Sequence, residues 1–66
     1  MTSPTYTAAE IKEMCKAADF DYESYKILVE LIEKEIHMYS TEDLRLLAEA
    51  SIIAMNRGLL KRLFER

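Results

Sequence analysis

Residues 44–64 read LRLLAEASIIAMNRGLLKRLF, and the apolar positions of this stretch change direction halfway along it. On a helix with 100° per residue, the apolar side chains of the first half share one side: Leu46, Leu47, Ala50, Ile53 and Ala54. Those of the second half lie on nearly the opposite side: Leu59, Leu60, Leu63 and Phe64. Because one helix cannot bury both stripes against a single neighbour, the stretch either breaks at residues 56–58 or carries an outward-facing leucine surface.

Gly58 is the residue on which this choice depends. A glycine can end a helix by adopting a left-handed conformation. A glycine inside a helix costs only about 1 kcal/mol, however, and no proline follows this one. We therefore predict one long helix over residues 41–65, with a break at 56–58 as the alternative. In the long helix the second stripe has no partner within the chain, which predicts a protein interface made of Leu59, Leu60, Leu63 and Phe64.

Two further helices are predicted upstream of this stretch. Thr7 and Glu10 have the spacing of a capping box, which starts a helix over residues 7–18. Asp21 is a good cap for a second helix over residues 22–38, and Ser40 is a cap candidate for the third. Residues 1–6 are predicted to be a loose arm. The expected fold is all-α: one small three-helix domain over residues 1–66, a helical hairpin plus an N-terminal helix.

The size of the chain limits how it can be stabilised. Sixty-six residues bury only about 60% of the unfolded surface, so such a domain is marginal alone. Cys15 is the only cysteine, which excludes a disulfide within one chain. One cysteine and one histidine cannot supply the four ligands of a structural zinc site. We expect no metal and no cofactor, and we predict that the chain forms a homo-oligomer such as a homodimer.

The net charge of −3 conceals an uneven distribution. Residues 10–49 hold eleven acids against five bases, a balance of −6, and residues 57–66 hold four bases against one acid, a balance of +3. The body should repel nucleic acid and the C-terminal segment should attract it weakly. The candidate phosphate contacts are Arg57, Lys61, Arg62 and Arg66.

The residue types that carry catalysis are present but do not form a recognisable pattern. Cys15 lies on the apolar stripe of the first helix, where a small buried hydrophobe is expected. His37 lies in the last turn of the second helix, where a cation suits the helix dipole. Solvated helix faces account for the acids Glu33, Glu35, Asp43 and Glu49. We therefore predict that the chain is not an enzyme.

Phe20, Tyr22 and Tyr25 cluster at the turn between the first two helices, beside several acids. Aromatic residues are enriched at protein interfaces, so the three form a second candidate contact surface. The alternative is that they cap the end of a small core.

The segment from Leu28 to Glu65 resembles the Hha/YmoA family of small helical regulators. The resemblance rests on Leu28-Val29-Glu30-Leu31-Ile32-Glu33-Lys34, then Ser40, then Leu44, then Leu63-Phe64-Glu65. It implies a cytoplasmic protein that modulates transcription by contacting the nucleoid protein H-NS. The position of the acidic residue that the family uses toward its partner is occupied here by Ile52. Residues 30–36 also resemble the hairpin of Sda-type kinase inhibitors.

These observations together predict a small cytoplasmic regulator, adaptor or inhibitor that binds another protein. The N-terminus has no visible signal peptide, and the longest apolar stretch, Leu46 to Met55, is too short to span a bilayer. The lone cysteine fits a reducing compartment. One alternative is a nucleic-acid-associated accessory factor that uses the basic C-terminal segment. Another is a purely structural homo-oligomer.

Overall fold

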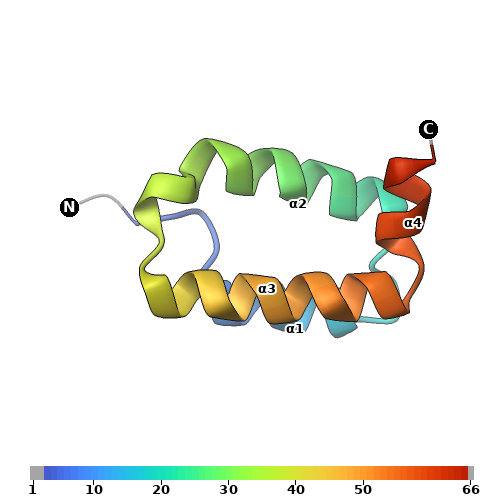
Figure 1. Cartoon of the computed structure of the whole chain (residues 1–66), viewed down its shortest axis with the longest axis horizontal. Helices are drawn as coiled ribbons and strands as arrows, with labels where there is room; N and C mark the ends of the chain where they lie inside the picture. The colour runs from blue at the N-terminus through green and yellow to red at the C-terminus, as the bar shows by residue number, and fades with distance from the viewer. Residues whose placement is uncertain (1–2, 66) are drawn as a thin grey trace.

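The computed structural model describes residues 3–65, and these residues form an all-α domain that measures 36 × 19 × 19 Å. The helices are α1 (Ala8–Lys16), α2 (Tyr22–Glu35), α3 (Thr41–Asn56) and α4 (Leu59–Phe64), and a short 3₁₀ helix, η1 (Ile36–Met38), follows α2 directly. Figure 1 shows α2 and α3 as an antiparallel hairpin, with α1 lying along the far side of α3. The predicted fold class is confirmed.

Each long helix begins at the residue that the sequence indicates. The Thr7 hydroxyl accepts a hydrogen bond from the Glu10 amide, and the Glu10 carboxylate accepts one from the Thr7 amide, which completes the predicted capping box. Ser40 and Asp43 form a second capping box at the start of α3. The Asp21 carboxylate accepts from the Ser24 amide at 2.9 Å and caps α2. The helix starts are therefore encoded locally.

The spacing between helices follows from the size of the buried side chains. Ala8 of α1 and Ala50 and Ala54 of α3 are buried, and these small residues let α1 and α3 pack closely over their length. Helix α2 presents Tyr25 and Leu28 to this pair and so stands farther away (Figure 1). The core consists of residues from all four α-helices, α4 giving Leu59 alone, and from the connecting turns: Ala8, Ile11, Cys15, Phe20, Tyr25, Leu28, Tyr39, Leu47, Ala50, Ala54 and Leu59.

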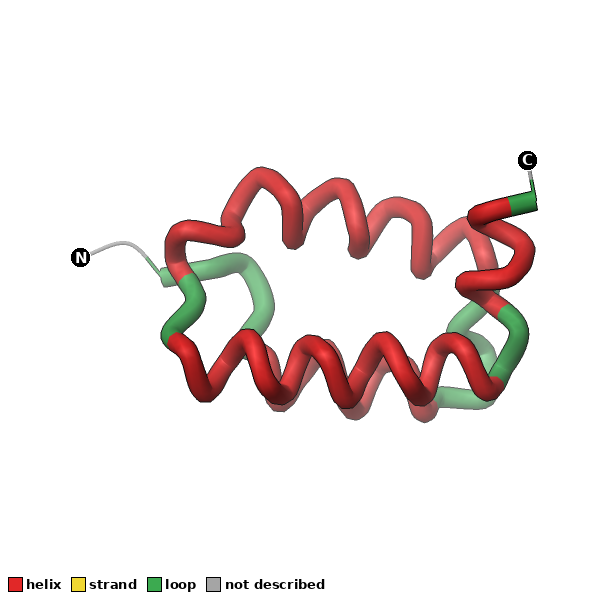
Figure 2. The backbone as a smooth tube through the Cα atoms, viewed as in Figure 1, coloured by secondary structure: helices red, strands yellow, loops and turns green. Residues whose placement is uncertain are grey.

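The favoured prediction of one long helix over residues 41–65 is wrong, and the alternative, a break at residues 56–58, is what the structure has. Helix α3 ends at Asn56, Gly58 adopts a left-handed conformation with φ of 82°, and α4 begins at Leu59. Figure 2 shows the loop between them, after which α4 turns back toward the start of α2. The break brings Leu59 into the core, where it is 7% exposed. Burying a leucine stabilises the fold by about 2 kcal/mol, which exceeds the local advantage of an unbroken helix.

The predicted loose arm is also wrong over the part that the structure describes. The amide and hydroxyl of Thr5 donate hydrogen bonds of 2.9 and 2.7 Å to the two carboxylate oxygens of Glu35. The Tyr39 hydroxyl donates to the carbonyl of Tyr6 at 2.9 Å. The arm is therefore fastened to the end of α2 and to the turn after η1, and Tyr6 has a defined position beside α1.

Candidate protein-interaction surfaces

The predicted leucine surface does not form as expected. Leu59 is buried, and Leu60 and Leu63 are partly buried against the core. Phe64 is 80% exposed, so it alone of the four presents most of its side chain to solvent. The break at Gly58 accounts for this outcome, because it turns the second apolar stripe inward. An outward-facing leucine surface is therefore not the candidate contact site.

The aromatic cluster follows the alternative reading. Phe20 and Tyr25 are both buried, and their rings pack edge to face with centroids 6.4 Å apart and an interplanar angle of 87°. Tyr22 is partly buried against the same core. The three residues cap one end of the core, so they do not form a separate exposed surface.

The candidate phosphate contacts are divided between different places. The guanidinium of Arg57 donates hydrogen bonds to the carbonyls of Cys15, Ala17 and Ala18 at 2.8, 2.6 and 3.4 Å, and so caps the C-terminal end of α1. Lys61 and Arg62 are exposed on α4, and Arg66 lies outside the described residues. The guanidinium of Arg57 thus stabilises the end of α1, a role that the charge pattern of the sequence did not indicate.

A first apolar groove lies between α1, α2 and the N-terminal arm. It holds a pocket of about 340 Å³ that is lined mainly by apolar side chains: Tyr6, Met14, Phe20, Ile27, Leu28 and Leu31, with Thr5 and Ser24. Ile27 is 66% exposed at the edge of this pocket. The docked arm forms one wall of the groove, so the hydrogen bonds of Thr5 to Glu35 also shape it.

Acids predominate on the rims of this groove. Two further hollows adjoin it, one that shares Tyr6 and Met14 and includes Glu10 and Glu13, and one that shares Ile27 and Leu31 and includes Glu30 and Lys34. Glu10, Glu13 and Glu30 lie along the rim with two bases, Lys34 and Lys16, the second of which pairs with Glu13 at 3.2 Å, so the rim has a net negative charge. We call this surface the acidic groove. Its apolar floor and negative rim suit a partner with an apolar stripe and flanking bases.

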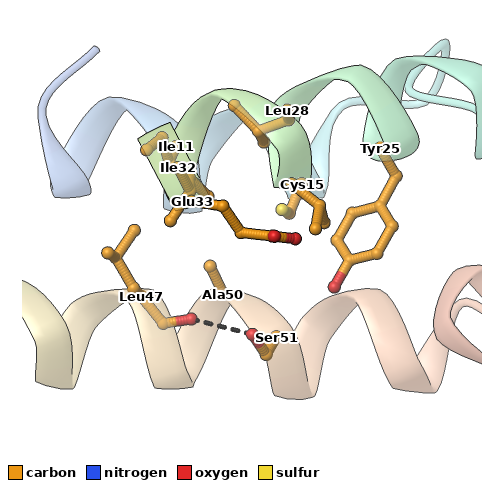
Figure 3. Close-up of a pocket in the computed structure, with 10 residues that line it drawn as sticks. Ile11, Cys15, Tyr25, Leu28, Ile32, Glu33, Leu47, Ala50 and Ser51 are labelled. Atoms are coloured by element: carbon orange, nitrogen blue, oxygen red, sulfur yellow. Dashed lines mark hydrogen bonds between the residues drawn. The ribbon is translucent and has the colours of Figure 1, made fainter. Parts of the chain in front are cut away.

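A second groove lies on the other side of α2, where it faces α3. Figure 3 shows its pocket, of about 190 Å³, with Tyr25 and Glu33 reaching in from α2 and Leu47 and Ser51 from α3. Burial raises the pKa of the Tyr25 phenol, and the Ser51 hydroxyl acts in the opposite direction. The Ser51 hydroxyl donates to the carbonyl of Leu47 at 3.1 Å. We call this surface the α2–α3 groove.

The side chains considered as catalytic candidates lie at separate positions in the fold. Cys15 is buried as a free thiol, and desolvation raises its pKa, with the charge of Arg57 opposing the shift. His37 is exposed in η1. The Lys12 ammonium donates a hydrogen bond of 2.6 Å to the Glu49 carboxylate and forms an ion pair with it. The hydrogen bond and the charge of Lys12 lower the pKa of Glu49. Within residues 3–65, no three His, Cys, Asp or Glu side chains gather in a way that could hold a metal ion.

Sequence reasoning missed most of the residues that form the two grooves. Tyr6 and Met14 lie far from Ile27 in the sequence and meet it only through the fold. One signal was available: Ile27 and Leu31 make the apolar face of α2 wider than a single neighbouring helix can cover.

No protein-family model, curated protein or solved structure matches this chain. The resemblance to the Hha/YmoA family therefore stays a prediction. A search of the described residues for a helix long and apolar enough to cross a membrane found none.

Proposed function

We propose that this chain is a small non-catalytic regulator or adaptor that binds another protein through its acidic groove. The observation that carries the proposal is the exposed side chain of Ile27 on an apolar floor with carboxylates on both rims. Apolar surface gathered in this way on a chain of this size is typical of a contact site. The proposal includes a cytoplasmic location, in keeping with the free thiol of Cys15.

The shape and charge of the groove favour a basic amphipathic helix as the partner segment. A helix laid into such a groove would place its apolar side chains against Met14, Phe20 and Leu31. Lysine or arginine residues beside that stripe would face Glu13 and Glu30. Charges on the rim of an interface mainly raise the association rate and select the partner, while the apolar floor supplies most of the affinity.

The surroundings of Cys15 are in keeping with a non-catalytic role. A reactive cysteine needs a lowered pKa, and burial raises that of Cys15. Three of the candidate acids already have structural partners. Glu35 binds Thr5 of the arm, Asp43 caps the start of α3, and Glu49 pairs with Lys12.

Site-specific photo-crosslinking in cells of the native host tests this proposal. A photoreactive phenylalanine analogue placed at Ile27 should capture a protein, and the same analogue placed at Glu42, exposed in the first turn of α3, should not. An Ile27→Glu variant should lose that partner in a pull-down and keep its helical content, because Ile27 is largely exposed. Equal capture from both positions, or retention of the partner by Ile27→Glu, contradicts the assignment of the site.

A further inference from the structure

Exposed apolar side chains also lie along the α2–α3 groove, on the face opposite the acidic groove. Leu44, Ala48 and Met55 lie on the same side of α3 as Ser51, which lines the pocket. Met55 is 60% exposed, and Leu44 and Ile36, at the other end of the groove, are each more than 40% exposed. The small residues Ala48 and Ser51 occupy the middle of the stripe. This face therefore has the outline of a helix-packing surface without a covering element.

The charges on this face differ from those on the rest of the body. Glu33 lines the groove, and Lys26 lies seven residues earlier on the same side of α2. Of the acids of α3, Asp43 caps the helix, Glu49 is paired with Lys12 of α1, and Glu42 lies on the opposite side of the helix from Ser51. Lys26 and Glu33 balance one another on this face, with Glu30 at its edge toward the acidic groove, whereas residues 10–49 as a whole carry −6. Two copies of an acidic chain repel one another least where their faces are neutral.

A two-fold contact over the α2–α3 groove would use most of this side of the molecule. The outline of the whole molecule is 36 by 19 Å, about 700 Å², and a standard interface buries about 800 Å² on each partner. The chain is also small enough that covering this groove would add substantially to a thin core.

We propose that a second copy of this chain covers the α2–α3 groove, with the two copies related by a two-fold axis that passes near Val29 and Ser51. Under this symmetry α2 of one copy runs antiparallel to α2 of the other. Lys26 lies three residues before Val29, and Glu33 lies three residues after Glu30, so the midpoint between them is at the axis. The two-fold rotation therefore places Lys26 of each copy opposite Glu33 of the other. Ala48 and Ser51 allow α3 to approach its symmetry mate closely.

This arrangement predicts a specific pattern of charge reversals. Lys26 and Glu33 are seven residues and about 10 Å apart along α2, which is farther than the three- or four-residue spacing of ion pairs within a helix. Lys26→Glu alone and Glu33→Lys alone place like charges opposite one another at two symmetric positions. Each should raise the dissociation constant of the dimer at least about tenfold. The double variant has the composition of the parent and should restore the dimer.

A second substitution tests the face without relying on the ion pair. Ala48→Glu places a carboxylate in the middle of the apolar stripe and should give a monomer with the helical content of the parent, because Ala48 is exposed. Ala9→Glu makes the same change at an exposed position of α1, away from the groove, and should leave the dimer intact.

Light scattering coupled to size exclusion, over a range of protein concentrations, measures the oligomeric state of the parent and of the five variants. A dimeric parent with the predicted pattern supports the proposal. A parent that is monomeric at every concentration, or a dimer that survives Ala48→Glu, would overturn it. Failure of the double reversal to restore the dimer would overturn the two-fold arrangement. Crosslinking at Ile27 reports on the opposite face, so the two proposals can fail separately.

Discussion

At the scale of single residues, Arg57 shows how a local charge pattern can hide a structural role. Helix α1 ends at Lys16, and the two residues that follow are alanines, so no glycine is present to cap the last carbonyls. Carbonyl groups at a helix end need a donor, and Arg57 supplies it from the end of α3. One side chain thus joins α1 to the turn that reverses the chain at Gly58.

Replacing Arg57 with alanine should lower the free energy of unfolding by about 1–2 kcal/mol, because a charged group loses its hydrogen bond to the partly buried Cys15 carbonyl and its exposed bonds to Ala17 and Ala18. Urea denaturation checks this, with an unchanged slope indicating that only stability has changed. Arg62→Ala is the matched control, since Arg62 is exposed on α4. Equal midpoints for the two variants would show that the cap contributes nothing.

Glu35 makes the docking of the arm depend on pH. The amide and hydroxyl of Thr5 lower the pKa of this carboxyl group by hydrogen bonding to its charged form. A carboxylate whose pKa is lowered by folding stabilises the folded state above its unfolded pKa, and this contribution is lost as the pH falls through the lowered value. Acidification below the ordinary range of a glutamate should therefore release the arm.

Amide chemical shifts recorded during an acid titration measure this release. The Thr5 amide should move with the protonation of Glu35 while signals from α3 remain in their native positions. A Thr5→Val variant lacks one of the two donors and should release the arm at a higher pH. An arm that stays docked at a pH where Glu35 is fully protonated contradicts the role of the carboxylate.

At the scale of elements, Gly58 determines the relation between α3 and α4. A β-carbon at this position would meet no atom within 4 Å, so the effect of Gly58→Ala comes from the backbone. Because an alanine in the left-handed region is strained, the variant should be less stable by about 1 kcal/mol. Gly58→Asn should be affected less, since asparagine tolerates this conformation. Thermal unfolding measures the stability of both variants. If Gly58→Ala proved more stable and more helical than the parent, the chain would prefer a continuous helix through this position.

The starts of the helices could be predicted from sequence, and their ends and packing could not. The caps at Thr7, Asp21 and Ser40 use residues at most three positions apart, so the whole interaction lies within one short window. The break at Gly58 depends on burying Leu59 in the core, where α4 contacts α2, a helix that lies more than twenty residues earlier in the chain. Local reasoning registered the small penalty of a glycine inside a helix and could not weigh it against that distant gain.

At the scale of the whole molecule, the same limit applies to the candidate surfaces. Both apolar stripes of residues 44–64 were visible in the sequence, but the left-handed turn buries Leu59 and partly buries Leu60 and Leu63 of the second one. The acidic groove joins the arm, α1 and α2, and only the unusual width of the apolar face of α2 indicated that it exists. The uneven charge of the chain was readable in advance, whereas its division between an acidic face and a neutral face required the fold.

The proposed dimer should make the stability of the molecule depend on its concentration. When a folded dimer unfolds to separate chains, each tenfold rise in concentration adds about 1.4 kcal/mol per mole of dimer, or about half of that per chain. For a domain of this size, the melting temperature should rise by about 3–6 °C. The shift should persist in high salt, since apolar contacts supply most of the interface and salt screens only the exposed charges. Ala48→Glu should melt at one temperature regardless of concentration, and Ala9→Glu should behave like the parent. Circular dichroism measures these melting temperatures. A parent whose melting temperature does not change with concentration would contradict the proposed dimer.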